Sequence, residues 1–262
     1  MLPVTSSLRT ILAQGRTVVG LAACVIRTSE IVTVTRSCGF DFILIDMEHG
    51  PISIGDAATL SIAAHEGGFP ALVRASGPSS PDLARVLDCG AQGVVVPHVD
   101  TVEQARHIAS TCRFPPVGKR SIPSPLVRLD FQNPPLKEGM ERIEADTFVI
   151  AMIESKAGVK AAADIAAVPG IDGIMIGSND LAADLGHVGE VEHEDVRRAF
   201  GSVAEATLKH KKLFGVIGLP ESLLQSHGRD LGAKLFVATN DINLLIEGGE
   251  ATLGRVRPLA IF

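Results

Sequence analysis

A short polar segment follows an apolar run near the start of the chain. Residues 42–45 are all apolar, and they are followed by Asp46, Met47, Glu48 and His49. Asp46 and His49 are three residues apart, where a strand should give way to a loop. A carboxylate close to an imidazole can fix its tautomer and raise its basicity, as a general base requires. The spacing therefore predicts a base, His49, oriented by Asp46, with polar capping of a loop as the alternative.

Two further carboxylates end later aliphatic runs. Glu154 follows residues 148–153, and Asp180 follows residues 173–179. Neither has a His or Cys beside it, so the pair favours a hard divalent cation such as Mg²⁺ or Mn²⁺. The alternatives are a salt bridge from Glu154 to Lys156 or a neighbouring arginine, and an N-cap role for Asp180 in a short helix over residues 181–185.

Other residues at the ends of these runs can bind a substrate. Gly177, Ser178 and Asn179 open a helical pattern, where unpaired backbone amides can bind a carboxylate. Arg74 can pair with a carbonyl or enolate oxygen, and a structural salt bridge is its alternative. His98 is expected to be a structural histidine. Lys156 should point inward like Glu154, but nothing indicates a depressed pKa, so a Schiff base is not expected.

The elements that must position these residues alternate along the chain. Eight short aliphatic runs predict strands at 17–22, 42–46, 70–74, 93–97, 148–154, 173–177, 213–217 and 234–238. Helical patterns are clearest at 56–65, 81–89, 102–112, 157–168, 194–211 and 241–255. This alternation predicts an α/β fold, a (β/α)8 TIM barrel formed by residues 1–262 as a single domain, with the site at the carboxyl ends of the strands. A doubly wound open sheet is the alternative, but no Gly-x-Gly-x-x-Gly follows the first strand.

One segment interrupts the alternation. Residues 114–144 contain six prolines and read as a long connection. A connection of this length in a compact domain is usually functional or interfacial, so we expect a lid or a subunit-contact arm, with a disordered insert as the alternative.

Composition excludes several classes of protein. The net charge is −6 and no basic stretch is present, which argues against nucleic-acid binding. The four cysteines are widely spaced and fit neither a zinc site nor a disulfide framework, so we expect a cytoplasmic protein. No apolar run reaches the roughly 18 residues of a membrane helix, so no membrane partner is expected.

Several segments together resemble one known family. The order and spacing of the segments 44–50, 73–74, 86–93, 96–101, 115–120, 153–156 and 170–181 are similar to those of the metal-dependent pyruvate aldolases, which include 4-hydroxy-2-oxoheptanedioate and 2-dehydro-3-deoxyglucarate aldolases. The match runs almost from end to end. It departs from the common pattern at Phe42, Met152, Ser178 and Asn179, so substrate selection is the property it leaves open.

The resemblance implies a cofactor and an assembly. The cofactor would be Mg²⁺, Mn²⁺ or Co²⁺, with Glu154 and Asp180 as ligands. The assembly would be a homo-hexamer, a trimer of dimers in which the last helix is exchanged between subunits. Asp88 would then reach the site of a neighbouring subunit.

The resemblance also implies the chemistry. The enzyme would be a carbon–carbon lyase that cleaves a 4-hydroxy-2-oxo acid to pyruvate and an aldehyde, through a metal-bound pyruvate enolate stabilised by Arg74. His49, paired with Asp46, would act as the base through a metal-bound water, and the amides of residues 177–179 would hold the pyruvate carboxylate. The alternatives are an oxaloacetate decarboxylase or a decarboxylating, carbon–carbon bond-forming enzyme similar to macrophomate synthase. A silent 2-oxo-acid-binding protein is disfavoured, because binding alone needs no positioned base.

Overall fold

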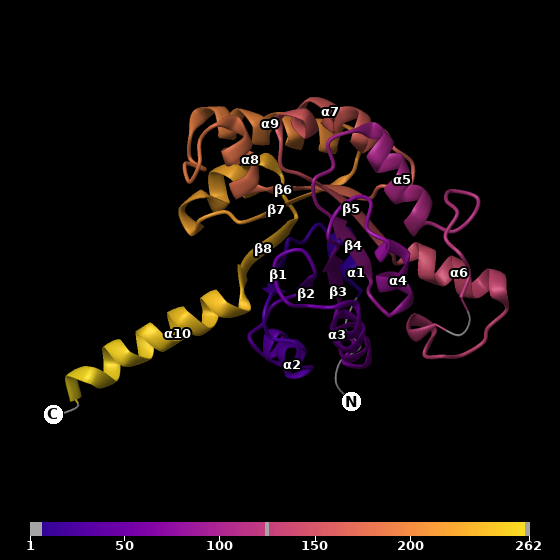
Figure 1. The fold of residues 1–262 in the computed structure, drawn as a ribbon, viewed down its shortest axis with the longest axis horizontal. Coiled ribbons are helices and arrows are strands. Elements are labelled where there is room, and N and C mark those ends of the chain that lie inside the picture. Colours follow the sequence, from indigo (N-terminus) through magenta and orange to yellow (C-terminus); the bar gives the residue numbers. More distant parts are fainter. Residues whose placement is uncertain (1–6, 124–125, 260–262) are drawn as a thin grey trace.

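Eight parallel strands form a closed barrel in the computed structural model, which describes residues 7–123 and 126–259. Each strand pairs with the next along the chain, and β8 closes on β1 (Figure 1). The strands are β1 (Val18–Ala23), β2 (Phe42–Asp46), β3 (Ala71–Arg74), β4 (Gly93–Val96), β5 (Phe148–Ile153), β6 (Gly173–Gly177), β7 (Leu213–Ile217) and β8 (Leu235–Asn240). The predicted TIM barrel is confirmed, and the open doubly wound sheet is excluded.

Helices alternate with the strands along the chain, and those between β1 and β8 lie outside the barrel (Figure 1). They are α1 (Leu8–Ala13), α2 (Glu30–Ser37), α3 (Ile54–Glu66), α4 (Leu83–Asp88), α5 (Val102–Cys112), α6 (Leu136–Ala145), α7 (Lys156–Ala167), α8 (Ser178–Leu185), α9 (Glu194–Lys209) and α10 (Asp241–Val256). Short helical turns lie at η1 (Val127–Leu129), η2 (Glu221–Leu223), η3 (Leu224–Gly228), η4 (Arg229–Leu231) and η5 (Arg257–Leu259). All six helices predicted most clearly from the sequence are present.

Alternation along each strand separates two cores. On β2, Phe42 and Leu44 belong to the cluster inside the barrel, whereas Ile43 and Ile45 belong to the cluster between strands and helices. Because successive side chains of a strand point to opposite faces, the next inward position after Leu44 is Asp46. The same rule places the final inward residue of each strand at the carboxyl-terminal mouth of the barrel.

The other end of the barrel is closed by α1. Leu8 and Ile11 are buried in the same inner cluster as Phe148 and Leu235. Ser7 caps this helix by accepting a hydrogen bond from the Thr10 amide. The mouth at the opposite end is therefore where a ligand can enter.

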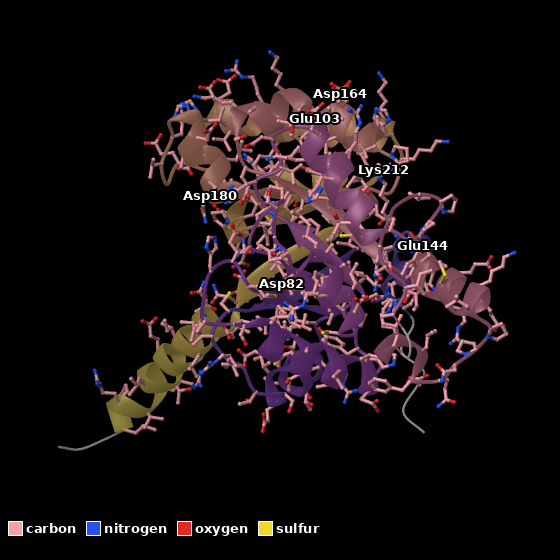
Figure 2. The ribbon with its side chains drawn as sticks, turned by 45° about the vertical axis from the view of Figure 1, so that its right-hand side comes forward. Asp82, Glu103, Glu144, Asp164, Asp180 and Lys212 are labelled. Carbon is pink, nitrogen blue, oxygen red and sulfur yellow. The ribbon has the colours of Figure 1, made fainter. Side chains whose placement is uncertain are left out.

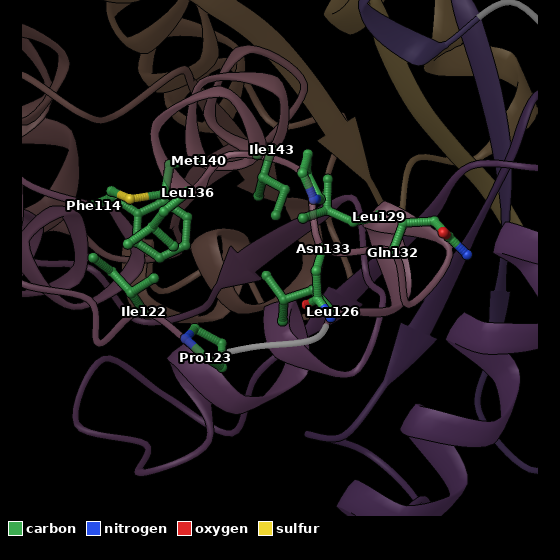
Figure 3. A pocket seen from close by; sticks show the side chains of 12 residues that line it. Phe114, Ile122, Pro123, Leu126, Leu129, Gln132, Asn133, Leu136, Met140 and Ile143 are labelled. Atoms are coloured by element: carbon green, nitrogen blue, oxygen red, sulfur yellow. The ribbon is translucent and has the colours of Figure 1, made fainter.

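The long connection over residues 114–144 differs from the prediction. It contains η1 and the helix α6, which was not expected from the sequence. The amphipathic pattern of α6 buries Ile143 against Phe114 and Leu126, and a small apolar pocket lies between this helix and the loop (Figure 3). The segment thus has its own apolar cluster rather than being a structureless insert; its expected role as a lid or contact arm remains a prediction.

The last helix has an unusual position. α10 extends away from the barrel instead of packing along it (Figure 1). Asp241 is its one buried residue, while Leu245, Ile246, Leu253 and Val256 are exposed. The Asp241 carboxylate accepts hydrogen bonds from the amides of residues 24–26, which fixes the start of the helix to the loop after β1. Across the described ranges, no helix is both long enough and apolar enough to span a membrane.

Candidate active site

A cavity of about 760 Å³ lies at the carboxyl-terminal mouth of the barrel. The ends of β1, β3, β5, β6, β7 and β8 contribute to it, together with the first turns of α8 and α10. Asp180 stands on α8 on the side of the barrel toward α10 (Figure 2). The predicted residues that line the cavity are His49, Arg74, Glu154, Gly177, Ser178, Asn179 and Asp180. Chain segments separated by more than 130 residues therefore meet in one cavity.

Asp46 binds Arg74 through a bidentate ion pair. Nε of Arg74 donates to Oδ1 of Asp46 at 2.9 Å, and Nη2 donates to Oδ2 at 2.5 Å. The two residues are direct partners in the register of β2 and β3, so the pair spans adjacent strands. Burial opposes the charge of Asp46, but hydrogen bonds and the positive charge of Arg74 outweigh it and lower the pKa of this carboxyl group. Asp46 thus fixes the guanidinium plane of Arg74.

The expected pairing of Asp46 with the His49 imidazole was wrong for this structure. Within the described chain, Asp46 contacts His49 only through the His49 backbone amide, at 3.4 Å. The imidazole is 61% exposed, and its nearest charged group is Glu48, with 3.8 Å between Nε2 and Oε2. The physical reason is competition, because the fork of Arg74 occupies both oxygens of Asp46. His49 still lines the cavity, but its orientation does not come from Asp46.

Glu154 is a buried carboxylate at the end of β5. It continues the inward series of Phe148, Ile150 and Met152, and it is 3% exposed. Burial raises its pKa; the amide and imidazole of His98 act in the opposite direction, and the charges of Glu48 and Asp180 raise it further. The protein therefore stabilises the negative charge of ionised Glu154 less well than water does.

Gly177 makes room for Glu154. A Cβ atom at Gly177 would collide with Oε1 of Glu154, so the close approach of β6 to this carboxylate requires glycine. Asp180 lies in the first turn of α8, but its carboxylate does not cap the helix, and in the described part of the chain it has no hydrogen-bond or ion-pair partner. The N-cap role considered for Asp180 is therefore excluded.

These features fit a divalent cation. Glu154 and Asp180 line the cavity with Glu48 and Asp46 close behind them, and Arg74 is the one guanidinium among them. Four carboxylates next to one guanidinium leave excess negative charge, and two all-oxygen ligands are the kind Mg²⁺ and Mn²⁺ take together with water and substrate oxygens. The donor set therefore agrees with a metal at Glu154 and Asp180.

Sequence analysis missed the role of Glu48 as a connector. Its Oε2 lies 3.1 Å from Nη1 of Arg74, and its Oε1 lies 2.9 Å from Nε2 of His98. His98 in turn contacts Glu154, with Nδ1 3.3 Å from Oε2 and the backbone amide 2.9 Å from the same oxygen. Polar contacts through Glu48 and His98 thus connect Arg74 to the proposed metal ligand. The expectation that His98 supports the site rather than lining it agrees with this position.

The start of α8 faces the cavity. Ser178 donates a hydrogen bond from its hydroxyl group to the Ile217 carbonyl at 2.6 Å, which anchors the helix to the end of β7. Gly177 is the N-cap and contributes no side-chain cap, so the first amides of the helix remain available for an anion. Ser178 and Asn179 line the cavity beside them.

Three other residues lie elsewhere. Asp88 ends α4, does not line the cavity of its own chain, and accepts hydrogen bonds from Arg120 at 2.6 and 3.2 Å. Lys156 is exposed at the start of α7, so the expectation that it points inward was wrong, because the chain leaves the strand conformation at Ser155. Met152 is fully buried in the inner core, below the cavity.

The sequence also left one wall of the cavity unidentified. The ends of β7 and β8, with η2, η3 and α10, contribute Leu219, Pro220, Glu221, Leu224, Thr239, Asn240, Asn243 and Glu247. The available signal was polar and turn-forming residues after the last two strands, in 218–221 and 239–241.

Comparison with known proteins identifies the family of the chain. A family model described as HpcH/HpaI aldolase/citrate lyase matches residues 26–230. The 4-hydroxy-4-methyl-2-oxoglutarate aldolase of Hapsidospora irregularis is 32% identical over 255 residues, covering 95% of this chain and 94% of the relative. The 4-hydroxy-2-oxo-heptane-1,7-dioate aldolase of Klebsiella pneumoniae is 32% identical over 247 residues, covering 93% and 91%.

Solved structures show the same architecture. The crystal structure of the HpcH/HpaI aldolase of Desulfitobacterium hafniense superimposes with a TM-score of 0.90 at 25% identity, covering 98% of each chain. Macrophomate synthase superimposes with a TM-score of 0.80 at 24% identity, covering 100% of this chain and 94% of the other, a likeness that concerns the fold alone. The barrel and the two similar aldolases lead to one conclusion: the chain belongs to the HpcH/HpaI aldolase/citrate lyase family and is a carbon–carbon lyase of the aldolase type.

Proposed function

We propose that this aldolase cleaves a 4-hydroxy-2-oxo acid to pyruvate and an aldehyde, with a divalent cation held by Glu154 and Asp180. The observation that carries the proposal is the meeting of Arg74, Glu154 and His49 in one cavity, beside the free amides of α8. A cation bound there would supply Lewis-acid stabilisation of the negative charge that develops on the 2-oxo oxygen.

Residues of the chain bind the substrate carboxylate and stabilise the charge on the 2-oxo oxygen. The first amides of α8 bind the C1 carboxylate of the substrate, because a helix N-terminus favours an anion. Arg74, held in one plane by Asp46, directs its positive charge at the 2-oxo oxygen. This fixed charge is already in place when the enolate forms, so no reorganisation is needed at that moment.

The proton transfer is assigned to His49. Its imidazole takes the proton from the C4 hydroxyl group, the C3–C4 bond breaks, and the electron pair remains on the three-carbon fragment as the enolate of pyruvate. The former hydroxyl carbon leaves as the aldehyde carbonyl. Protonation of the enolate at C3 then gives pyruvate and completes the balance of atoms and charge.

The acceptor side of the cavity favours an uncharged aldehyde. Glu221 and Glu247 line this wall together with neutral residues such as Asn240 and Asn243. Within the described residues, the basic side chains lining the cavity are Arg74 and His49, and both have roles at the pyruvate end. A second carboxylate would meet repulsion, whereas hydroxyl groups could bond to the two amides. We therefore expect hydroxylated neutral aldehydes to be preferred to carboxylated ones.

The assembly is part of the proposal. The exposed apolar residues of α10 indicate that another copy of the chain covers this helix, in line with an exchanged last helix in a homo-hexamer. Asp88, remote from its own cavity, would act at the site of a neighbouring copy and could orient the His49 that Asp46 does not. Light scattering should show an oligomer at assay concentration. An active monomer would refute both statements.

The central test uses metal-depleted enzyme. Pyruvate release from 4-hydroxy-2-oxo acids should disappear after EDTA treatment and return with Mg²⁺, Mn²⁺ or Co²⁺. Glu154→Gln should abolish this recovery, while the matched exposed variant Glu103→Gln on α5 should recover like the wild type. Full activity of the EDTA-treated enzyme would exclude the metal-dependent mechanism.

One observation favours a second activity, the decarboxylation of oxaloacetate. Loss of CO₂ gives the same pyruvate enolate but removes no proton from a hydroxyl group. It therefore needs Arg74 and the cation but not His49, whose imidazole lacks a hydrogen-bonded carboxylate within the described chain. Oxaloacetate turnover below one hundredth of aldol turnover under matched conditions would exclude it as a main activity.

A further inference from the structure

The loop between α8 and α9 gathers four side chains that the aldolase site does not use. His187 and His193 stack with 3.4 Å between ring centroids and 17° between ring planes. Glu190 lies between them in sequence, and its Oε2 is 3.8 Å from Nδ1 of His187. Asp195, in the first turn of α9, contacts Nε2 of His187 at 3.0 Å. The loop lies where the end of α8 meets the start of α9 (Figure 1).

The ligand atoms of this loop lie close to the spacing that one metal ion requires. Ligand atoms of His187, Glu190 and His193 all lie within 4.8 Å of one another. The two imidazole planes are nearly parallel in the stack, so their in-plane nitrogen lone pairs do not converge, and one ring has to turn out of the stack when both bind the same ion. Two atoms each about 2.1 Å from a shared ion can be at most about 4.2 Å apart, so the 3.8 Å between Glu190 and His187 fits.

A carboxylate beside the loop also orients one of the two histidines. Asp195 approaches Nε2 of His187, the arrangement by which a carboxylate orients a metal-binding histidine through its other ring nitrogen.

We propose that His187, Glu190 and His193 form a second metal site, for a borderline divalent transition ion such as Zn²⁺, Ni²⁺ or Cu²⁺. Imidazole nitrogens select these ions over Mg²⁺, which prefers oxygen ligands. The site is separate from Glu154 and Asp180, because it lies beyond the far end of α8, and the helix rises by about 7.5 Å from Asp180 to its last residue, Leu185. None of its three residues lines the aldolase cavity. A bound ion would tie the end of α8 to the start of α9.

The experiment counts metal ions with the first site disabled. Protein carrying Glu154→Gln and Asp180→Asn is stripped with EDTA, dialysed against micromolar Zn²⁺ and analysed for bound zinc. One Zn²⁺ per chain is expected, and a hundredfold excess of Mg²⁺ should not displace it. Adding His187→Ala and His193→Ala should reduce the count to zero, whereas the exposed control His107→Ala should leave it at one. This comparison is valid whether or not Glu154 holds a metal in the wild type.

Two further measurements separate a built site from a chance contact. Asp195→Asn should weaken Zn²⁺ binding about tenfold, the usual effect of losing the partner of a histidine ligand. Zn²⁺ should raise the melting temperature of the protein with an intact loop but not of the His187→Ala/His193→Ala protein, since binding to the folded state stabilises it. An unchanged zinc count after removal of both histidines, or no zinc in the parent variant, would overturn the proposal.

Discussion

Replacing Asp46 by Asn should separate the two roles that this carboxylate could have. The structure places Asp46 against Arg74, whereas proximity in sequence suggested the imidazole of His49. Asp46 is fully buried and Arg74 is 7% exposed. Removing one partner of a buried ion pair usually costs about 3–5 kcal/mol, because the other charge is left uncompensated. We expect about 3 kcal/mol for Asp46→Asn, since Glu48 remains 3.1 Å from Nη1 of Arg74.

A double-mutant cycle measures this coupling directly. Asp46→Asn and Arg74→Met should each destabilise the protein, and the double variant should lose less than the sum of the two, with a coupling energy on the order of 2 kcal/mol. Asp46→Asn and His49→Ala should instead be additive within about 0.5 kcal/mol. The surface pair of Asp82 with Arg85 offers a control, because Asp82→Asn should change stability by less than about 1 kcal/mol.

The assays are urea unfolding at pH 7 and pyruvate release under saturating cation. Asp46→Asn should lower kcat/KM by about 10²-fold, because a misdirected guanidinium no longer stabilises the enolate. Arg74→Lys should be similarly impaired although the charge is kept, since an ammonium lacks the planar fork. Strong coupling of Asp46 to His49 together with additivity toward Arg74 would refute the structural assignment and restore the pairing expected from the sequence.

The ion pair of Asp46 with Arg74 predicts how stability should change as the pH falls. The folded-state pKa of Asp46 is lowered, so its ion pair contributes full stability above the unfolded-state pKa of about 3.9. That contribution is lost as the pH falls through the lower folded-state pKa. The Asp46→Asn variant should therefore lose less stability than the wild type between neutral and strongly acidic pH. A steeper acid loss in the variant would contradict this sign.

Three further predictions address the cavity. Gly177→Ala should destabilise the protein by about 1–3 kcal/mol and reduce cation-dependent activity, since the new methyl group collides with Glu154; wild-type metal affinity in this variant would count against that contact. His49→Ala should slow aldol cleavage about 10²–10⁴-fold while oxaloacetate decarboxylation falls much less; equal losses would mean that His49 organises the site rather than moving the proton. Burial, and then the charge of Asp46, raises the pKa of the Cys24 thiol to about 12. At pH 8, iodoacetamide should therefore modify the exposed Cys38 well before Cys24. If mass spectrometry shows the reverse order, Cys24 is ionised.

The barrel could be predicted because its strands carry two signals at once. Buried parallel strands are continuous aliphatic runs, and the bounds predicted for residues 42–46, 173–177 and 213–217 agree with β2, β6 and β7. The period of two then places Arg74 and Glu154 at the mouth, because each continues an inward series on its strand. The positions of Arg74 and Glu154 at the mouth were therefore recoverable from strand ends alone.

The partner of Asp46 could not be predicted in the same way. Sequence spacing favoured His49, three residues away, whereas the actual partner lies 28 residues away on the neighbouring strand. The choice depends on the register of β2 with β3, which sets Asp46 directly beside Arg74. It also depends on the turn after β2, in which the amides of Glu48 and His49, and not the imidazole, approach Asp46. The pattern of a single sequence shows neither the register of the two strands nor the geometry of this turn.

The same strand ends give a physical reason for the cation proposed at this site. His98 has a φ of 55°, a left-handed conformation that costs a residue with a side chain about 1–2 kcal/mol. Its contacts with Glu48 and Glu154 offset that strain and connect the guanidinium of Arg74 to the carboxylates at the mouth. Even so, burial and neighbouring negative charge raise the pKa of Glu154. The protein thus leaves a buried carboxylate incompletely compensated, and a bound cation is the group that would balance this charge while keeping Glu154 ionised.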